Sequence, residues 1–449
     1  FTRDPSVLSV RSRPGSRFSY SNMGYTLAGM VIEAVTRERY EDWLDRELLR
    51  PLGMVDSTFH YRSQHGTRAD PRLAWGHHDA ATPAEALPVY LRPAGQLTTT
   101  AGDLALFARF LLGDGRAGGR VLVRPDLLRA MGRATTTDAA RAGLDAGYGL
   151  GLRRRDRHGV IGLCHDGSVV GFHAMLCMFP DARHPGGGRA FAVVQNIDGD
   201  GVDTARFDAL LIRWLAIPSP PAPPPRAAPA DVAAWQGLYV PAPNRFAAYA
   251  YVDYLFDRAR LSWSGNTLRF APLQGEARVL VPSGGARFTA HDRVEPSHVL
   301  FADGAQRLVS DGLRTYRRVS APAYWATAAS LASGLLGLLW FALVVPVRAL
   351  RGREPAWVPG VAAIVLLLLP VPAFFAQSFV QLGDRTVASV GLYAATAALP
   401  VLMAWQAARS LHRREGVVRG RVNLIAALLV LQWCAVLAVW GMLPFALWR

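Results

Sequence analysis

The sequence contains no lysine, and all 49 basic residues among its 449 are arginine. Any catalytic motif that needs a lysine amine is therefore incomplete within this chain. Cysteine is also scarce, with only Cys164, Cys177 and Cys434. So few cysteines at these spacings exclude a disulfide-rich scaffold and a zinc-binding cluster. Cys164 and Cys177 can face each other across a hairpin; a disulfide and two buried thiols are both open, and we favour the buried thiols.

Acidic residues are too few to balance the arginines, and the formal net charge is +15. Up to Ser320 the chain has 39 arginines against 31 acidic residues, and the shorter, more apolar remainder has 10 against 3. The excess is therefore concentrated beside apolar segments. No basic helix and no basic surface interleaved with aromatic residues is evident, so we expect no nucleic-acid partner.

Hydrophobic residues are abundant, at 51% of the chain with a mean hydropathy of +0.15. Beyond Ser320, four stretches without charge each reach the ~20 residues that cross a bilayer. We predict these stretches as membrane-spanning helices: Val319–Val347, Pro355–Gly383, Thr386–Ala408 and Val422–Trp448. Because no charged residue lies within a span, nothing marks an ion or proton path. The spans are therefore predicted to act as an anchor in contact with membrane lipid.

The loops between the spans predict their orientation. Arginines gather between the first two spans and between the last two, whereas only Arg385, beside Asp384, lies between the second and third. The positive-inside rule makes the two arginine-rich loops cytoplasmic. An even number of spans then places residues 1–319 and the C-terminus outside. The loop arginines are Arg348, Arg351, Arg353, Arg409, Arg413, Arg414, Arg419 and Arg421.

Composition divides the chain into four parts. Residues 1–216 alternate helical patterns with short strands, which predicts an α+β domain. Residues 217–232 are dominated by proline and alanine and predict a semi-rigid linker. Residues 233–319 hold short runs separated by turn signals, which predicts a small antiparallel β domain; residues 320–449 hold the four spans. The turn signals are Ser264-Gly265-Asn266, Ser283-Gly284-Gly285, Asp303-Gly304 and Asp311-Gly312.

The stretch FSYSNMGYTLAGMVIEAV, residues 18–35, places polar groups just before a helical run. The run Met23–Val35 is apolar on nearly all faces, which predicts a helix buried in its domain. Ser21 or Asn22 can cap it. In the structural interpretation Tyr20 packs and Asn22 caps. In the functional one the helix end opens on a cleft, where Tyr20 accepts a proton if a cation lowers its pKa and Asn22 holds a substrate carbonyl.

A second signal lies at Leu163–Ser168, which reads LCHDGS. The pattern predicts an edge strand, a turn containing Gly167, and two further strands at Val169–Phe179 and Phe191–Asn196. An edge strand with a histidine and a glycine can dock an extended substrate and lend a backbone N–H to an oxyanion. For His165 taken alone, packing at a strand end is the simpler interpretation.

The two signals, in this order, resemble a known family: the penicillin-recognising serine hydrolases. It includes class C β-lactamases, D-alanyl-D-alanine carboxypeptidases, D-aminopeptidases and β-lactamase-like esterases. The resemblance covers Pro14 to Leu215, and it implies the β-lactamase/transpeptidase-like fold, an antiparallel sheet with helices on both sides. The matching pieces are PGSRFSYSNMGYTLAGMVIEAVT (14–36), RPLGMVDSTF (50–59), RPAGQLTTTAGDLALFARFL (92–111), GYGLGL (147–152), HDGSVVGF (165–172) and FAVVQNIDGD (191–200).

The resemblance assigns roles to two of the family's three catalytic motifs. The Tyr-x-Asn motif matches Tyr20-Ser21-Asn22, so Tyr20 is implied as the general base or its electrostatic partner, and Asn22 as a substrate-orienting amide. The third motif, Lys or His, then Thr or Ser, then Gly, resembles His165-Asp166-Gly167. His165 is implied to support Tyr20 and the substrate, and the backbone N–H of Ser168 to be an oxyanion donor.

Asp166 departs from the family pattern, which has a small hydroxyl residue at this place. We expect its carboxylate to repel the substrate carboxylate that β-lactams and peptidoglycan stems carry. That weakens a β-lactamase interpretation and leaves esterase and amidase chemistry more open. No cofactor and no metal are expected.

The family's first motif, Ser-x-x-Lys, supplies the nucleophile, and a chain without lysine does not contain it. In the family it lies on a helix well upstream of Tyr-x-Asn. Two hypotheses follow: the chain is the C-terminal part of an active enzyme, which its non-methionine start favours, or it is a degenerate module that binds cell-wall or peptide ligands. We favour the first. The implied partner is a small-molecule or peptide substrate.

Three other features are interpreted as structural. His77-His78-Asp79 lacks the spacing of a metallo-hydrolase and is interpreted as a polar loop. Ser168 follows a glycine directly and is not a nucleophile elbow. The run Arg153–Arg155 is predicted to face solvent near a turn.

Overall fold

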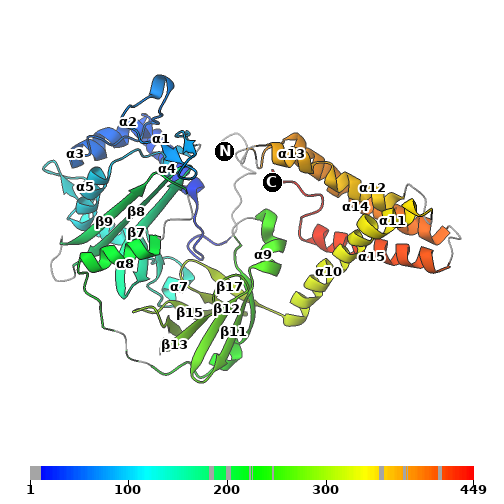
Figure 1. The fold of residues 1–449 in the computed structure, drawn as a ribbon. Coiled ribbons are helices and arrows are strands. Elements are labelled where there is room, and N and C mark those ends of the chain that lie inside the picture. Colours follow the sequence, from blue (N-terminus) through cyan, green and yellow to red (C-terminus); the bar gives the residue numbers. More distant parts are fainter. Residues whose placement is uncertain are drawn as a thin grey trace.

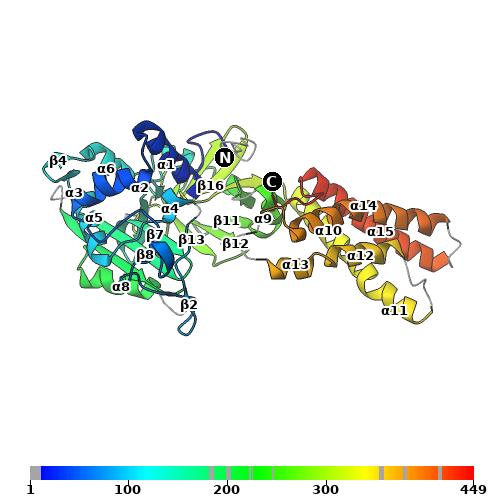
Figure 2. The same cartoon turned by 90° about the horizontal axis from the view of Figure 1, so that it is seen from above.

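The computed structural model describes residues 12–89, 91–181, 187–198, 204–221, 224, 226–244, 247–352, 358–377, 381, 383–412 and 417–448. Three parts follow one another in space: a domain built around a sheet, a β-barrel, and a bundle of long helices (Figure 1, Figure 2). The barrel lies between the other two.

The first part is organised by the antiparallel sheet β5-β6-β7-β8-β9 (strand order as written). The helix α5 packs on one face through Ala108, which contacts Leu176 and Met178. The helix α8 packs on the other through Ile212. A sheet with helices on both sides confirms the predicted fold class. The strands are β1 (Gly76–His77), β2 (Pro83–Ala84), β3 (Arg116–Ala117), β4 (Arg120–Val121), β5 (Gly147–Tyr148), β6 (Arg153–Arg157), β7 (Val160–Val169), β8 (Phe172–Pro180) and β9 (Gly188–Gln195).

Residues typical of helix caps and tight turns lie at the ends of helices and strands in this part. The Thr100 side chain caps α5 by accepting a hydrogen bond from the backbone N–H of Asp103. His158 and Gly159 both have positive φ, as a tight two-residue hairpin between β6 and β7 requires. The helices are α1 (Asn22–Thr36), α2 (Tyr40–Leu44), η2 (Asp45–Leu49, a π-helical turn), α3 (Arg50–Leu52), η3 (Gly66–Arg68), α4 (Arg92–Gly95), α5 (Ala101–Leu112), α6 (Pro125–Met131), α7 (Asp138–Arg141) and α8 (Thr204–Trp214).

Helix α1 occupies the predicted residues but is not buried as predicted. Only Thr26 and Gly29 are buried. One face packs on α4 so closely that a Cβ on Gly29 would lie 2.3 Å from the Pro93 Cγ. The opposite face is apolar and exposed, and Val35 retains 78% of its accessible surface. Apolar residues on all faces predict burial within the domain, whereas the described residues cover one face of α1 alone.

Strand β7 corrects two further predictions. It is the middle strand of the sheet and not an edge strand, because β6 pairs with its first half, Val160–Cys164. Its second half, His165–Val169, pairs with β8 and has no described partner on the other side. The turn predicted at Gly167 lies instead at Val170-Gly171, where Gly171 has a φ of +76°.

Cys164 and Cys177 form a disulfide, so the preference for two buried thiols was wrong. The two residues are direct cross-strand partners on β7 and β8, with Cα atoms 4.2 Å apart. The pairing register could not be read from the spacing of the cysteines alone, and it is this register that brings the sulfurs together.

The second part is a barrel in which β10 to β17 follow one another and β17 closes on β10. Each predicted turn signal falls between two of its strands. Closure removes the free edges that an open sheet of hairpins would expose. The elements are η4 (Val232–Trp235), β10 (Gly237–Pro241), η5 (Ala247–Tyr249), α9 (Ala250–Phe256), β11 (Ala259–Ser264), β12 (Thr267–Pro272), β13 (Arg278–Gly284), β14 (Arg287–Ala290), β15 (His298–Asp303), β16 (Gln306–Ser310) and β17 (Thr315–Val319).

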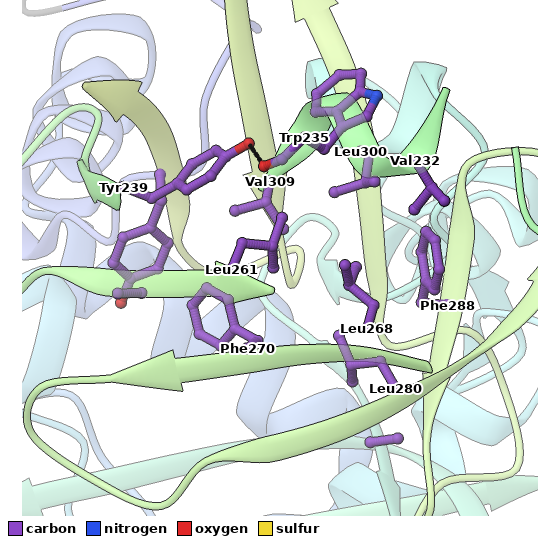
Figure 3. Close-up of a cluster of buried hydrophobic side chains, with 13 residues drawn as sticks. Val232, Trp235, Tyr239, Leu261, Leu268, Phe270, Leu280, Phe288, Leu300 and Val309 are labelled. Carbon is purple, nitrogen blue, oxygen red and sulfur yellow. Dashed lines mark hydrogen bonds between the residues drawn. The ribbon is translucent and has the colours of Figure 1, made fainter. Parts of the chain in front are cut away.

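The barrel interior is filled by side chains. Leu268, Leu280 and Phe288 lie on the successive strands β12, β13 and β14. All three are fully buried and belong to one hydrophobic cluster (Figure 3). Tyr239 is also fully buried, and its hydroxyl donates a hydrogen bond of 2.6 Å to the Trp235 carbonyl, which closes the barrel end beneath η4. The interior is thus a packed core.

The third part contains four segments long and apolar enough to cross a membrane within the described residues: Ala321–Leu350, Pro359–Ala376, Val387–His412 and Gly420–Val439. The second span includes Pro370, and the ends predicted for it lie partly outside the described residues; the fourth span ends at Val439. Arg353, Arg413 and Arg414, on which the predicted orientation also rests, lie outside the described residues. The helices are α10 (Ala321–Leu339), η6 (Trp340–Val344, π-helical), α11 (Val345–Leu350), α12 (Pro359–Leu368), α13 (Val371–Ala376), α14 (Val387–His412) and α15 (Val417–Val439).

The barrel core contains one titratable group that makes its stability depend on pH. His298 is buried against the Phe270 ring, and its Nε2 has no hydrogen-bond partner among the described residues. Burial, the largest cause, lowers the pKa of His298 from 6.5 to about 4. The unfolded chain therefore binds a proton at a higher pH than the folded chain, and stability present above pH 6.5 is lost as the pH falls through 4.

We predict that the barrel of the detergent-solubilised chain loses roughly 2–4 kcal/mol between pH 7 and pH 4 through this histidine. His298→Leu removes the titration, so it should flatten this part of the pH dependence. His291→Leu, at an exposed position of the same barrel, should leave the slope as it is. Denaturant unfolding followed by proteolysis of the barrel measures both, and equal slopes in the two variants would contradict the assignment.

Candidate active site

The residues of the Tyr-x-Asn motif lie where an extended segment enters α1. Ser21 is the N-cap, with its side chain accepting a hydrogen bond of 3.0 Å from the Gly24 N–H. Asn22 is the first helical residue and is exposed, so its amide is not needed as the cap. Tyr20, just outside the helix, is 41% exposed.

Tyr20 and His165 come together although they lie far apart in the sequence. Their ring centroids are 6.5 Å apart. The Tyr148 ring of β5 is near both, 5.9 Å from the Tyr20 ring and 6.0 Å from the His165 ring, so the three rings form a triangle. Phe18 stacks on the other side of Tyr148 at 5.1 Å, with the rings nearly parallel. These four rings define the aromatic cluster of the candidate site.

The orientation of His165 is fixed by one hydrogen bond. Its Nδ1 lies 2.5 Å from the carbonyl oxygen of Gly151. A carbonyl can only accept, so Nδ1 carries the proton and donates it. In the neutral ring Nε2 is then the nitrogen that can accept a proton from a neighbouring hydroxyl.

The open half of β7 carries the other predicted site residues. Gly167 and Ser168 are exposed, and a Cβ on Gly167 would meet nothing within 4 Å. Since β6 begins at Arg153, opposite Cys164, the residues of β7 beyond that point have no strand partner on this side among the described residues. The geometry offers a strand edge to which an extended molecule can add.

Asp166 has a cationic partner that was not predicted. Arg153 Nη2 lies 3.0 Å from its carboxylate. Successive side chains of a strand leave on opposite faces, so Asp166 shares a side with Cys164, and His165 is on the other. Both facts weaken the expected repulsion of a substrate carboxylate.

Sequence reasoning missed Tyr25 and Tyr148 as members of this region. Burial raises the pKa of Tyr148, Asp166 adds to the increase, and Arg153 opposes it. Burial likewise raises the pKa of Tyr25, with a smaller contribution from Tyr20. Both hydroxyls therefore stay protonated at neutral pH. The GYGLGL piece at 147–152 was the signal that could have pointed to Tyr148.

The run Arg153–Arg155 does not face solvent as predicted. Arg154 donates two hydrogen bonds to the barrel residue Glu295 at 2.9 and 2.6 Å. Arg155 lies 2.7 Å from the buried carboxylate of Asp208 on α8. Successive side chains of β6 lie on opposite sides of the sheet, so neighbouring guanidinium groups bind different partners.

Two other regions lie apart from the aromatic cluster. His78 of the HHD segment and His173 of β8 approach Asp198 at 3.4 and 3.2 Å; no group of three potential metal ligands occurs in the part of the chain that the structure describes. A cavity of about 670 Å³ lies between residues 12–17, the barrel and Trp440, and its lining includes neither Tyr20 nor His165. The candidate active site is therefore the region of Tyr20 and His165 and not this cavity.

Tyr148→Ala should loosen the aromatic cluster, because it removes contacts to three rings that are worth roughly 0.5–1.5 kcal/mol each. We expect faster deuterium uptake in residues 18–22 of the full chain, measured by hydrogen exchange and mass spectrometry. Tyr148→Phe keeps the ring and should keep the protection. Uptake that is unchanged in both variants would refute the role of the ring.

Comparison with known proteins gives the following relatives. The beta-lactamase family model matches residues 3–213. Penicillin-binding protein 4 of Amycolatopsis lactamdurans is 30% identical over 253 residues, which are 50% of this chain and 60% of that protein. Protein flp of Staphylococcus aureus is 32% identical over 110 residues, 23% of this chain and 21% of that protein. The chain thus spans less than two thirds of these relatives.

Among solved structures, the crystal structure of SurE with D-Leu is 25% identical, covers 69% of each chain and has a TM-score of 0.41. The D-amino acid amidase from Ochrobactrum anthropi SV3 is 24% identical, covers 46% of this chain and 59% of its own, and has a TM-score of 0.34.

Proposed function

We propose that the chain, whose residues 3–213 match the beta-lactamase family model, is part of a membrane-anchored serine hydrolase that works by acyl-enzyme chemistry. The substrate class is an ester, an amide or a D-amino-acid peptide. The observation that carries the proposal is the approach of Tyr20 to His165 beside the open half of β7.

Each described residue has one role in the proposed mechanism. Tyr20 takes the proton from the attacking serine hydroxyl and then passes it to the leaving group, and Nε2 of His165 supports it. Asn22 orients the substrate carbonyl. The backbone N–H of Ser168 is one of the donors that hold the oxyanion, with Gly167 keeping the approach to it open. Water then hydrolyses the acyl-serine.

The serine itself must come from a Ser-x-x-Lys segment, and no lysine occurs in this chain. The exposed apolar face of α1, with Tyr25, Val31 and Val35, begins beside Tyr20. A further element that packs on this face would bury it and bring a nucleophile to the site. This supports an active enzyme over the alternative, a nucleophile-free module that binds cell-wall or peptide ligands.

We further propose that the hydrolase domain and the barrel face outward, with the arginine-rich loops in the cytoplasm. The Cys164–Cys177 disulfide supports this, since such bonds persist mainly in oxidising compartments. No cofactor takes part in the proposed reaction.

The first prediction concerns the chain as it stands. A fluorophosphonate or a fluorescent penicillin should not label it covalently, because the activated serine is absent. The gel-based assay needs a related active serine hydrolase as a positive control. Stoichiometric labelling of this chain would overturn the assignment of the nucleophile to another segment.

A second prediction needs the coding sequence upstream of the Phe1 codon. Where that sequence encodes a Ser-x-x-Lys motif, it is expressed in frame with this chain. Tyr20→Phe should then lower kcat at least 10²-fold, the usual contribution of a general base, in a screen of esters, amides and D-amino-acid peptides. Tyr249→Phe, in the barrel part, should retain activity. A fully active Tyr20→Phe enzyme would make Tyr20 a packing residue.

A further inference from the structure

Helix α9 joins the barrel to the bundle through an aromatic contact. Tyr251 and Tyr254 are buried, and their rings lie 5.7 and 5.0 Å from the Trp440 ring. The Trp433 Nε1–H donates a 3.1 Å hydrogen bond to the Tyr251 hydroxyl. Both views place α9 between the barrel strands and α10 (Figure 1, Figure 2).

The position of Trp433 along α15 fixes the depth of this contact. The fourth span, Gly420–Val439, has 20 residues, which at 1.5 Å each give about 30 Å, the thickness of the hydrocarbon core. Trp433 precedes the end of the span by six residues, so it lies about 9 Å inside that boundary. A helix that reaches Trp433 therefore lies at the acyl–headgroup boundary, where interfacial helices bury 5–10 Å of their depth.

The opposite face of α9 is apolar as well. Val252 and Phe256 are one turn apart, so they share a face, and they are 38% and 44% exposed. Trp325, on the first turn of α10, is 56% exposed. The acidic residue of the helix, Asp253, accepts a hydrogen bond from Asn244. A helix that is apolar on both faces is typical of a core or a membrane and not of a water-exposed surface.

Arg258 follows α9 and lies over the same aromatic residues. Its guanidinium stands 5.4 Å from the Tyr324 ring and 5.8 Å from the Trp325 ring, and its Nε donates to the Tyr324 hydroxyl at 2.9 Å. The neighbouring Asp257 is directed to Arg314 instead. A cation held over ring faces at this level is placed to meet a lipid phosphate.

We propose that α9 and Arg258 form a lipid-binding surface by which the barrel rests on the bilayer: the face with Val252 and Phe256 lies among lipid, and Arg258 binds the phosphate of an anionic phospholipid. Lipid is the expected occupant because α9 contacts the membrane spans and because the positive charge of Arg258 complements a lipid phosphate. The inference rests on the proposed membrane anchoring and adds a second, monotopic contact to it.

The test uses the full chain with Cys434→Ala, reconstituted in lipid nanodiscs, with single spin labels at Val252→Cys and Phe256→Cys. Power saturation compares exposure to lipid-soluble O₂ with exposure to a water-soluble nickel complex. We expect strong O₂ and weak nickel exposure at both positions. Val279→Cys, exposed on the barrel, should give the opposite result.

Leu343→Cys, exposed in the first span, separates the two levels of the proposal. If its label is in lipid while those at 252 and 256 are in water, the anchoring stands and the α9 proposal is overturned. If its label is also in water, the anchoring itself fails.

The phosphate contact has its own measurement, the lipid retained after purification from nanodiscs of mixed anionic and zwitterionic lipid, read by native mass spectrometry. Arg258→Gln should lose the anionic enrichment, whereas Arg269→Gln, exposed on β12, should keep it. Equal enrichment in the two variants would overturn the role of Arg258.

Discussion

Three of the four arginines of β6 pair with carboxylates, and one of these pairs joins the first part of the molecule to the barrel. The run Arg153–Arg155 binds, in order, Asp166 beside the candidate site, Glu295 of the barrel and Asp208 of α8. Arginine suits this task because its planar fork can bind both oxygens of one carboxylate, as Arg154 does with Glu295. A chain without lysine thus connects its elements through directional contacts, and the candidate site sits at the end of the strand from which they start.

Two unfilled surfaces meet at that site. One is the half of β7 that β6 does not reach, and the other is the apolar face of α1 that the described residues leave open. An unpaired strand edge and an exposed apolar helix face are each unfavourable in isolation. The proposed function gives each surface one occupant: an extended substrate on the strand and a nucleophile-bearing element on the helix.

Features encoded by neighbouring residues could be predicted from the sequence. The helix cap at Ser21 or Asn22, the barrel turns at the Gly-Asn, Gly-Gly and Asp-Gly signals and the four apolar spans all rest on local patterns. Features that depend on strand register and on packing between distant residues could not be predicted. The start of β6 opposite Cys164 decides which half of β7 is an edge, and the separate register of β7 on β8 places Cys164 opposite Cys177. Likewise, the partners of Arg153–Arg155 lie up to 141 positions away along the chain, beyond any local pattern. Tyr148 is recognised as a site residue only because β5 brings its ring near those of Tyr20 and His165.

The barrel, closed, packed and fixed at both ends, has the properties of a rigid spacer. Its strands of four to seven residues make it roughly 15–25 Å tall. Arg154 connects one side to the domain built around the sheet, and α9 connects another to the helix bundle. Under the proposed function and anchoring, a domain held in this way would work at one height above the bilayer. It would then select among otherwise equivalent bonds by their distance from the lipid as well as by their chemistry.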